Sequence, residues 1–124
     1  MAADSTAKVL GIVFFLVLIS QGYGQYCSLK DLSLSQSKTG AKVQGKPEYS
    51  VSITNKCACV QSDVKLNCRG FKTVEKIDPS LLQVLGDECL VNYGNSIYRD
   101  AVNFTYAWDR PFPLFPISSQ ISCS

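Results

Sequence analysis

The sequence lacks histidine altogether, and among its 124 residues it has one tryptophan and one methionine. Without His, the chain has no Ser-His-Asp or Cys-His catalysis, no imidazole-ligated zinc and no histidine-based pH sensing. It also lacks a Walker A loop and a G-x-G-x-x-G turn, so nothing indicates a phosphate or dinucleotide site. The formal net charge is +2, which is too small to indicate a nucleic-acid partner. We therefore expect neither a cofactor nor a nucleic acid to bind.

Carboxylates are present, but they show no catalytic pattern. A glycosidase needs two of them flanking a groove, about 5 to 9.5 Å apart. The spacing brings no two of the candidates into one cleft, and Asp78 is better explained as a helix cap and Asp87-Glu88 as a polar turn. The sequence therefore predicts that the protein is not an enzyme. The candidates are Asp63, Asp78, Asp87, Glu88, Asp100 and Asp109.

Long hydrophobic runs are also missing, apart from eleven uncharged residues at positions 9–19 that follow Lys8. This run is too short for a bilayer span, which needs about 20 residues. Gly22 and Gly24 then supply the small residues of a cleavage site before Gln25. Residues 1–24 are thus predicted to be a secretory signal peptide. A membrane anchor is the weaker alternative, because no basic stop-transfer cluster follows and the C-terminus has no hydrophobic tail. We expect residues 25–124 to be one secreted, extracellular domain that does not insert into a membrane.

Six cysteines fall in that domain, and an even number in a secreted chain predicts three disulfides. Fifteen pairings are open, and only a bond between Cys57 and Cys59 is excluded, because on a strand their side chains lie too far apart. A metal site at Cys57-Ala58-Cys59 is the weaker alternative, since thiolate sites usually use C-x2-C spacing. The predicted disulfide residues are Cys27, Cys57, Cys59, Cys68, Cys89 and Cys123.

Apolar residues alternate with polar ones along most of the domain, which is typical of half-buried strands. Three of these segments place Cys on the apolar face, as disulfides that bridge the layers of a core would require. The fold class predicted is all-β: a single disulfide-stapled antiparallel β-sandwich, or a partly open barrel, of about seven short strands. The core-facing residues expected are Leu32, Leu34, Tyr49, Val51, Ile53, Cys57, Cys59, Val64, Leu66, Cys68, Val102, Phe104, Tyr106, Trp108, Ile117, Ile121 and Cys123.

Three local patterns interrupt the strands. The segment 78–86 predicts one short helix, because Asp78 can cap it, Pro79 suits its first turn and Gly86 can close it. Residues 61–63 suggest a hairpin turn. The polar, glycine-containing stretch 38–47 predicts a flexible loop.

Several segments of the sequence together resemble those of a known family. They are 47–59 (PEYSVSITNKCAC), 64–71 (VKLNCRGF), 89–92 (CLVN), 104–108 (FTYAW) and the late Cys123. In this order, and with six cysteines at this spacing, the chain resembles the plant tapetum determinant family of small secreted cysteine-rich proteins over nearly all of residues 27–124. The resemblance implies an apoplastic ligand for a leucine-rich-repeat receptor kinase that controls cell differentiation, as in anther cell fate.

Two segments are candidates for contact with such a partner. Arg110, Phe112, Leu114 and Phe115 combine three large apolar residues with Arg, and Arg and aromatic residues are enriched at binding hot spots. An irregular edge strand covering the core explains them as well. Lys38, Lys42 and Lys46 could attract an acidic receptor face or pectin, although a solvated loop would look the same.

Other functions remain open as alternatives. Tyr93, Tyr98 and Trp108 could stack on sugars in a cell-wall carbohydrate-binding module, although the strand pattern favours a buried Trp108. A defence protein such as an inhibitor is a third possibility. The sequon Asn103-Phe104-Thr105 predicts N-glycosylation, because the strand pattern turns Asn103 toward solvent.

Overall fold

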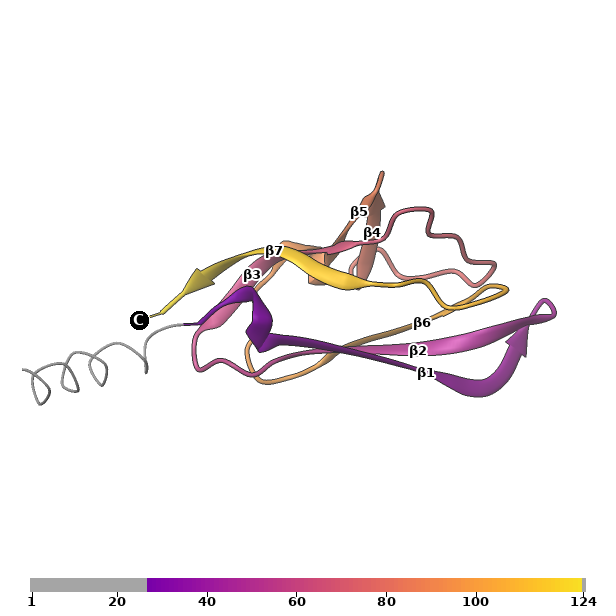
Figure 1. Cartoon of the computed structure of the whole chain (residues 1–124), viewed down its shortest axis with the longest axis horizontal. Helices are drawn as coiled ribbons and strands as arrows, with labels where there is room; N and C mark the ends of the chain where they lie inside the picture. The colour runs from indigo at the N-terminus through magenta and orange to yellow at the C-terminus, as the bar shows by residue number, and fades with distance from the viewer. Residues whose placement is uncertain (1–26, 124) are drawn as a thin grey trace, which may run out of the picture.

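The structure is a computed structural model that describes residues 27–123. Seven strands form two antiparallel sheets, with the orders β1-β2-β6 and β4-β5-β3-β7, that lie one over the other (Figure 1). The predicted all-β sandwich is therefore confirmed, whereas the predicted signal peptide lies outside the described residues. The elements are η2 (Leu29–Asp31), β1 (Leu32–Val43), β2 (Lys46–Asn55), β3 (Val60–Asn67), β4 (Leu82–Leu85), β5 (Glu88–Val91), η3 (Asn92–Gly94), β6 (Val102–Ala107) and β7 (Phe115–Ser122).

Along β2 and β6 the core forms where the alternating patterns predicted it. Tyr49, Val51 and Ile53 of β2 are buried. β2 pairs with β6 in a register that sets Val51 opposite Phe104. Side chains of the second sheet, such as Leu66, close the core from the other side. Because successive residues of a strand face opposite ways, the period of two carries the burial pattern directly.

The hairpin predicted at residues 61–63 is wrong, because β3 runs through them without turning back. Asp63 adopts a positive φ of 48°, and the pairing of β3 with β7 shifts register between Ser62 and Lys65. These are the marks of a β-bulge, which inserts an extra residue into one strand. The bulge explains why Gln61 and Val64, three positions apart, are both fully buried.

The helix predicted at residues 78–86 is also wrong beyond its first turn. Asp78 does cap a turn: its carboxylate accepts from the Ser80 N–H at 2.9 Å, which lowers the pKa of Asp78, and its carbonyl accepts from Leu81 N–H. Leu82 then begins β4, which pairs with β5 over its whole length. So short a helix is marginal on its own, and strand pairing that buries Leu82 decides the conformation. Gly86, with φ of 72°, starts the β4–β5 hairpin turn in place of closing a helix.

The flexible loop predicted at residues 38–47 is instead the end of a long hairpin. β1 continues to Val43 and β2 starts at Lys46, so only Gln44 and Gly45 form the turn. Both have positive φ (50° and 80°), as a type I′ hairpin turn requires. The hairpin extends past the second sheet (Figure 1). Most of its residues there are exposed, which is why the sequence shows no alternation.

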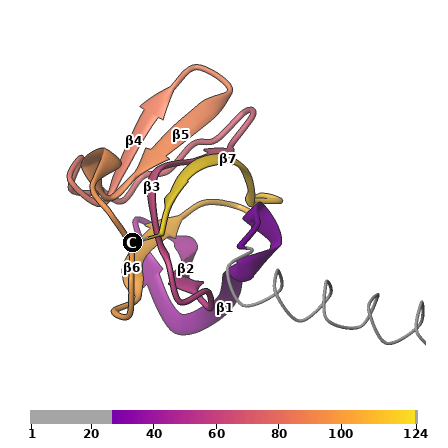
Figure 2. The ribbon, with the colours of Figure 1, turned by 90° about the vertical axis from the view of Figure 1, so that its left-hand side faces the viewer.

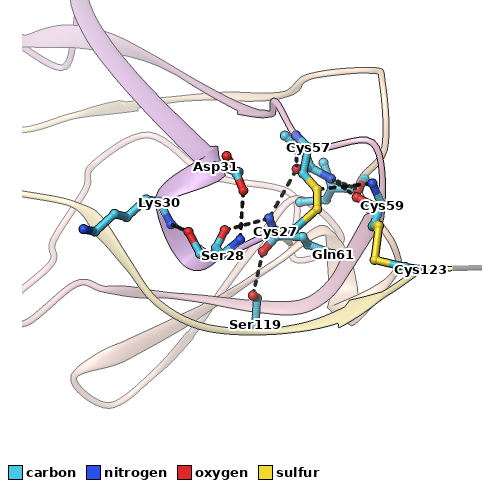
Figure 3. The surroundings of a disulfide bond; sticks show 11 residues. Cys27, Ser28, Lys30, Asp31, Cys57, Cys59, Gln61, Ser119 and Cys123 are labelled. Carbon is cyan, nitrogen blue, oxygen red and sulfur yellow. Dashed lines mark hydrogen bonds between the residues drawn. A yellow bond between two sulfur atoms is a disulfide. The ribbon is translucent and has the colours of Figure 1, made fainter. Parts of the chain in front are cut away.

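All six cysteines are paired, as Cys27–Cys57, Cys59–Cys123 and Cys68–Cys89. The first two bonds tie the segments just before η2 and just after β7 to the crossover between β2 and β3 (Figure 3). The third joins the end of β3 to its neighbour β5 within one sheet. The expectation that disulfides bridge the layers through the core is therefore wrong, because they lie at the ends of strands and along one sheet.

The C-terminal strand keeps its predicted facing except at its end. Ile117 and Ser119 are half-buried between the exposed Ser118 and Gln120, and Ser119 donates to Gln61 Oε1 at 2.7 Å (Figure 3). Only the last inward positions are wrong, because Ile121 is 38% exposed and Cys123 is exposed. Gln61 is fully buried, and its side-chain amide donates to Ser28 O and Asn55 Oδ1. A buried polar side chain needs such partners, and Ser119 supplies one of them from the inward side of β7. None of the helical turns in residues 27–123 is long and apolar enough to cross a membrane.

Candidate interaction surface

A groove of about 550 Å³ lies between β1 and the segment 111–113. Gln36, Ser37 and Lys38 line it from β1, and Phe112 lies opposite between two prolines. The two segments singled out from the sequence as partner-binding, which are more than 60 positions apart, thus meet at one site. Lys38 is exposed and is the only charged residue of the lining.

The groove rests on an aromatic cluster. Tyr49, which also lines the groove, lies 5.3 Å from Tyr106 between ring centroids. Tyr106 contacts Phe71 at 5.1 Å and Phe112 at 5.9 Å. Aromatic rings at these separations attract one another beyond their simple burial, so the Pro-flanked segment is anchored to the core.

Hydrogen bonds through one hydroxyl fix the same segment. Tyr106 is fully buried, and its hydroxyl donates to Gln36 Oε1 at 2.6 Å and accepts from Phe112 N–H at 3.0 Å. The Gln36 amide donates in turn to Phe112 O at 2.7 Å. Burial raises the pKa of Tyr106. The hydrogen bond from Phe112 N–H favours the phenolate and opposes this rise. The hydroxyl therefore stays protonated at neutral pH and holds both walls of the groove.

The other predicted contact residues lie apart from the groove. Leu114 is buried in the core, which leaves it no surface to offer, while Arg110 is exposed and Phe115 is 50% exposed at the start of β7. Lys42 is exposed near the tip of the β1–β2 hairpin. Lys46 is engaged, because its ammonium forms an ion pair with Asp109 at 2.6 Å.

The predicted burial of Trp108 is wrong, since it is only half-buried just beyond the end of β6. The Lys46 ammonium lies 5.4 Å from the centroid of its ring, a cation–π contact. Tyr93 and Tyr98 are exposed. Asn103 is also exposed, on β6, so its glycosylation stays a prediction.

Gln36, Tyr49 and Tyr106 were missed as site residues by sequence reasoning. A signal existed for Gln36, because it continues the inward parity of Leu32 and Leu34 along β1. For the two tyrosines the pattern predicted burial correctly, and nothing in it could reveal that Phe112 packs on them from a distant segment.

Two carboxylates from separate segments form a second unusual feature. Glu75 Oε2 accepts from Thr105 Oγ1 at 2.7 Å, whereas Glu75 Oε1 is buried without a hydrogen-bond partner among residues 27–123. Burial raises the pKa of Glu75; the Thr105 hydroxyl opposes this rise, and the neighbouring Glu48 carboxylate adds to it. The pKa of Glu48 is lowered, mainly by the Thr39 hydroxyl. Glu75 is therefore the member of the pair that keeps its proton longer as pH rises.

This pair predicts a pH-dependent stability. An acid whose pKa is higher in the folded than in the unfolded chain favours folding at low pH, and this contribution is lost as pH rises from the unfolded value of about 4.3 through the folded one. We expect Glu75→Gln to melt about 2 °C above the parent at pH 7, a small gain because water partly screens the pair, and to lose that gain near pH 4.

Calorimetric melts at both pH values measure this effect. Glu88→Gln, at an exposed carboxylate of β5, is the control and should leave the melting temperature unchanged. An equal shift from Glu75→Gln at pH 4 and pH 7 would contradict the assignment.

The sulfur atoms of Cys27, Cys57 and Cys59 all lie within 4.8 Å of one another. Thiolates in such a cluster could hold a soft metal ion. All three sulfurs are oxidised in disulfides here, so they offer no thiolate ligand and act as covalent links.

Comparison with known proteins shows to which family the chain is related. The family model described as Tapetum determinant 1, C-terminal, matches residues 28–124. The chain is 34% identical over 104 residues to TPD1 protein homolog 1 of Arabidopsis thaliana, covering 81% of this chain and 57% of that protein. It is 36% identical over 91 residues to TPD1 protein homolog 1B of Oryza sativa subsp. japonica, covering 71% and 54%.

The chain thus spans little more than half the length of these two relatives. No solved structure matches it closely enough to add to the assignment. The family match covers five of the six cysteines, both sheets and the segment that walls the groove, and on this basis the chain belongs to the tapetum determinant 1 family.

Proposed function

We propose that this protein is a secreted, apoplastic ligand for the ectodomain of a leucine-rich-repeat receptor kinase and that it controls cell differentiation, in reproductive tissue such as the anther. The proposal includes export by the signal peptide at residues 1–24 and release of residues 25–124. Membership of the tapetum determinant 1 family supports the developmental role.

The groove between β1 and residues 111–113 is the observation that carries the proposal. A cation, Lys38, and an aromatic side chain, Phe112, stand on opposite walls. Aromatic residues are enriched at interfaces, and an exposed ammonium steers an acidic partner toward the surface. Because Tyr106 and Gln36 fix both walls, the surface is already ordered before contact and loses little conformational entropy on binding. The concave face of a repeat solenoid suits a rigid, projecting ligand of this kind.

Binding of the purified chain to a panel of leucine-rich-repeat receptor kinase ectodomains tests the proposal. We expect one ectodomain to bind, and Lys38→Glu with Phe112→Ala to raise the dissociation constant at least about tenfold. Lys30→Glu with Tyr93→Ala is the matched control, because both residues are exposed on other elements. A thermal melt of each variant shows whether the fold is kept.

The carbohydrate alternative is tested on the same material by pull-down with insoluble cell-wall polysaccharide. Retention on polysaccharide together with no binding to any ectodomain in the panel would refute the ligand proposal. Equal loss of ectodomain binding in the test and control variants would place the contact elsewhere than the groove.

A further inference from the structure

The outer edge of β4 is exposed and apolar. β4 is the terminal strand of its sheet, and the β4–β5 hairpin projects from the rest of the molecule (Figure 2). Val84 and Leu85 are 49% and 47% exposed. A hollow of about 600 Å³ lies beside the strand, between Val84 and the segment 72–77. An uncharged edge with exposed apolar side chains is a ready template for another strand.

The other terminal strands are protected in ways that β4 is not. β1 carries Lys38 and Lys42 and an irregular register between them. The end of β6 is covered by residues 73–74, since Val74 N–H donates to Ala107 O at 3.0 Å. β7 contains Pro116 and two register shifts. β4 has a regular register and the sequence Leu-Gln-Val-Leu, with neither charge nor proline.

The register of the hairpin shows which backbone groups are available. Leu85 pairs with Glu88 across a two-residue turn, so this is a hydrogen-bonded pair. The alternation is confirmed four residue pairs further on, just beyond the end of β4, where Asn92 N–H donates to Leu81 O at 3.0 Å. The N–H and C=O of Val84 must therefore point away from β5. No hydrogen bond of these two groups is found within residues 27–123.

Charges around the edge are arranged to suit a second copy of the same strand. The hairpin turn is acidic, with exposed Asp87 and Glu88, and the far side of the hollow is basic, with exposed Lys72 and Lys76. Among residues 27–123 the only ion pair is between Lys46 and Asp109, so these four charges have no ionic partner in that part of the chain. In an antiparallel pairing centred on Val84, the acidic turn of each copy approaches the basic side of the other.

We propose that two copies of this chain pair through β4, antiparallel about a two-fold axis at Val84, so that the two four-stranded sheets become one continuous sheet. The Val84 N–H of each copy donates to the Val84 C=O of the other. The contact is isologous, so it closes on itself and stops at a dimer. Because only a short strand is buried, the dimer is weak, with a dissociation constant on the order of 10 to 100 μM. This inference is independent of the proposed receptor.

Sedimentation equilibrium of the full chain, secreted with its disulfides formed, tests the proposal between about 1 μM and 500 μM. We expect a reversible monomer–dimer transition, and Val84→Lys to raise the dissociation constant at least about thirtyfold, because a charge is forced into the apolar strand pair. Ile121→Lys is the matched control on β7, the opposite edge of the sheet, and should leave the transition unchanged.

Charge reversal provides a second test that does not alter the edge itself. Lys76→Glu alone and Asp87→Lys alone should each weaken the dimer about three- to tenfold, and the two together in one chain should restore it. Amide exchange should also show protection of Val84 that grows with protein concentration. A chain that stays monomeric up to 500 μM, or a dimer that survives Val84→Lys, would overturn the proposal. So would protection of Val84 that requires an added unrelated peptide.

Discussion

The double variant Cys68→Ala with Cys89→Ala is expected to lose about 4 to 5 kcal/mol of unfolding free energy. The bond closes a loop with a sequence separation of 21, and restricting such a loop in the unfolded chain contributes about 3 kcal/mol. Both sulfurs are buried, so removing them also loses core packing worth about 1 to 2 kcal/mol. The unfolding free energy of a single domain is only about 5 to 15 kcal/mol in total, so this loss could remove most of the stability of the fold. Urea denaturation measures it.

The position of the loss can be checked as well as its size. The β4–β5 hairpin joins β3 through only three residue pairs, one of which is Leu66 with Cys89. Without the bond, amide exchange should accelerate most in β4 and β5. Removing Cys59–Cys123 is the control, because that bond fixes the end of β7 and its loss should accelerate exchange there. Unchanged exchange in β4 and β5 of the first variant would show that pairing alone holds the hairpin.

Replacing Tyr106 by Phe is expected to cost about 2 kcal/mol, although it removes one oxygen atom only. The hydroxyl bonds both Gln36 Oε1 and Phe112 N–H, and its loss leaves the two groups unsatisfied where water is largely excluded. Thermal or urea unfolding measures this loss. Because Phe112 forms a wall of the groove, ectodomain binding should weaken in the same variant.

Tyr49→Phe is a matched control within the same aromatic cluster. Tyr49 is also buried, but its hydroxyl makes no hydrogen bond within residues 27–123. We expect its loss to change stability by less than about 0.5 kcal/mol. Equal costs for the two Tyr→Phe variants would mean that the Tyr106 hydroxyl does not hold the segment in place.

Much of the sandwich could be predicted because strand alternation is local. The inward sides of β2 and β6 follow from a period of two along each strand, and that period needs no knowledge of a partner strand. The same reasoning failed at Asp63, because a bulge reverses the parity without leaving a reliable mark in composition. It failed at residues 82–85, because a helix-like sequence there gains more from pairing with β5 than from a single helical turn.

The candidate site was predictable only in parts. Lys38 and Phe112 could each be named, since a basic residue on a polar stretch and an aromatic between prolines stand out in composition. That they face each other across one groove depends on Tyr106 and Gln36, which join segments about 70 positions apart. The bare edge of β4 was invisible for the same reason, because an edge exists only once the strand order is known.

The amino-acid sequence by itself determined the all-β class, the residues of the central core strands, the number of cysteines and the resemblance to the tapetum determinant family, because each is read from neighbouring residues or fixed spacings. Only the tertiary structure decided the disulfide pairing, the groove and the exposed edge of β4. These depend on which distant strands become neighbours, and that choice is made by the joint burial of both sheets and not by any one segment.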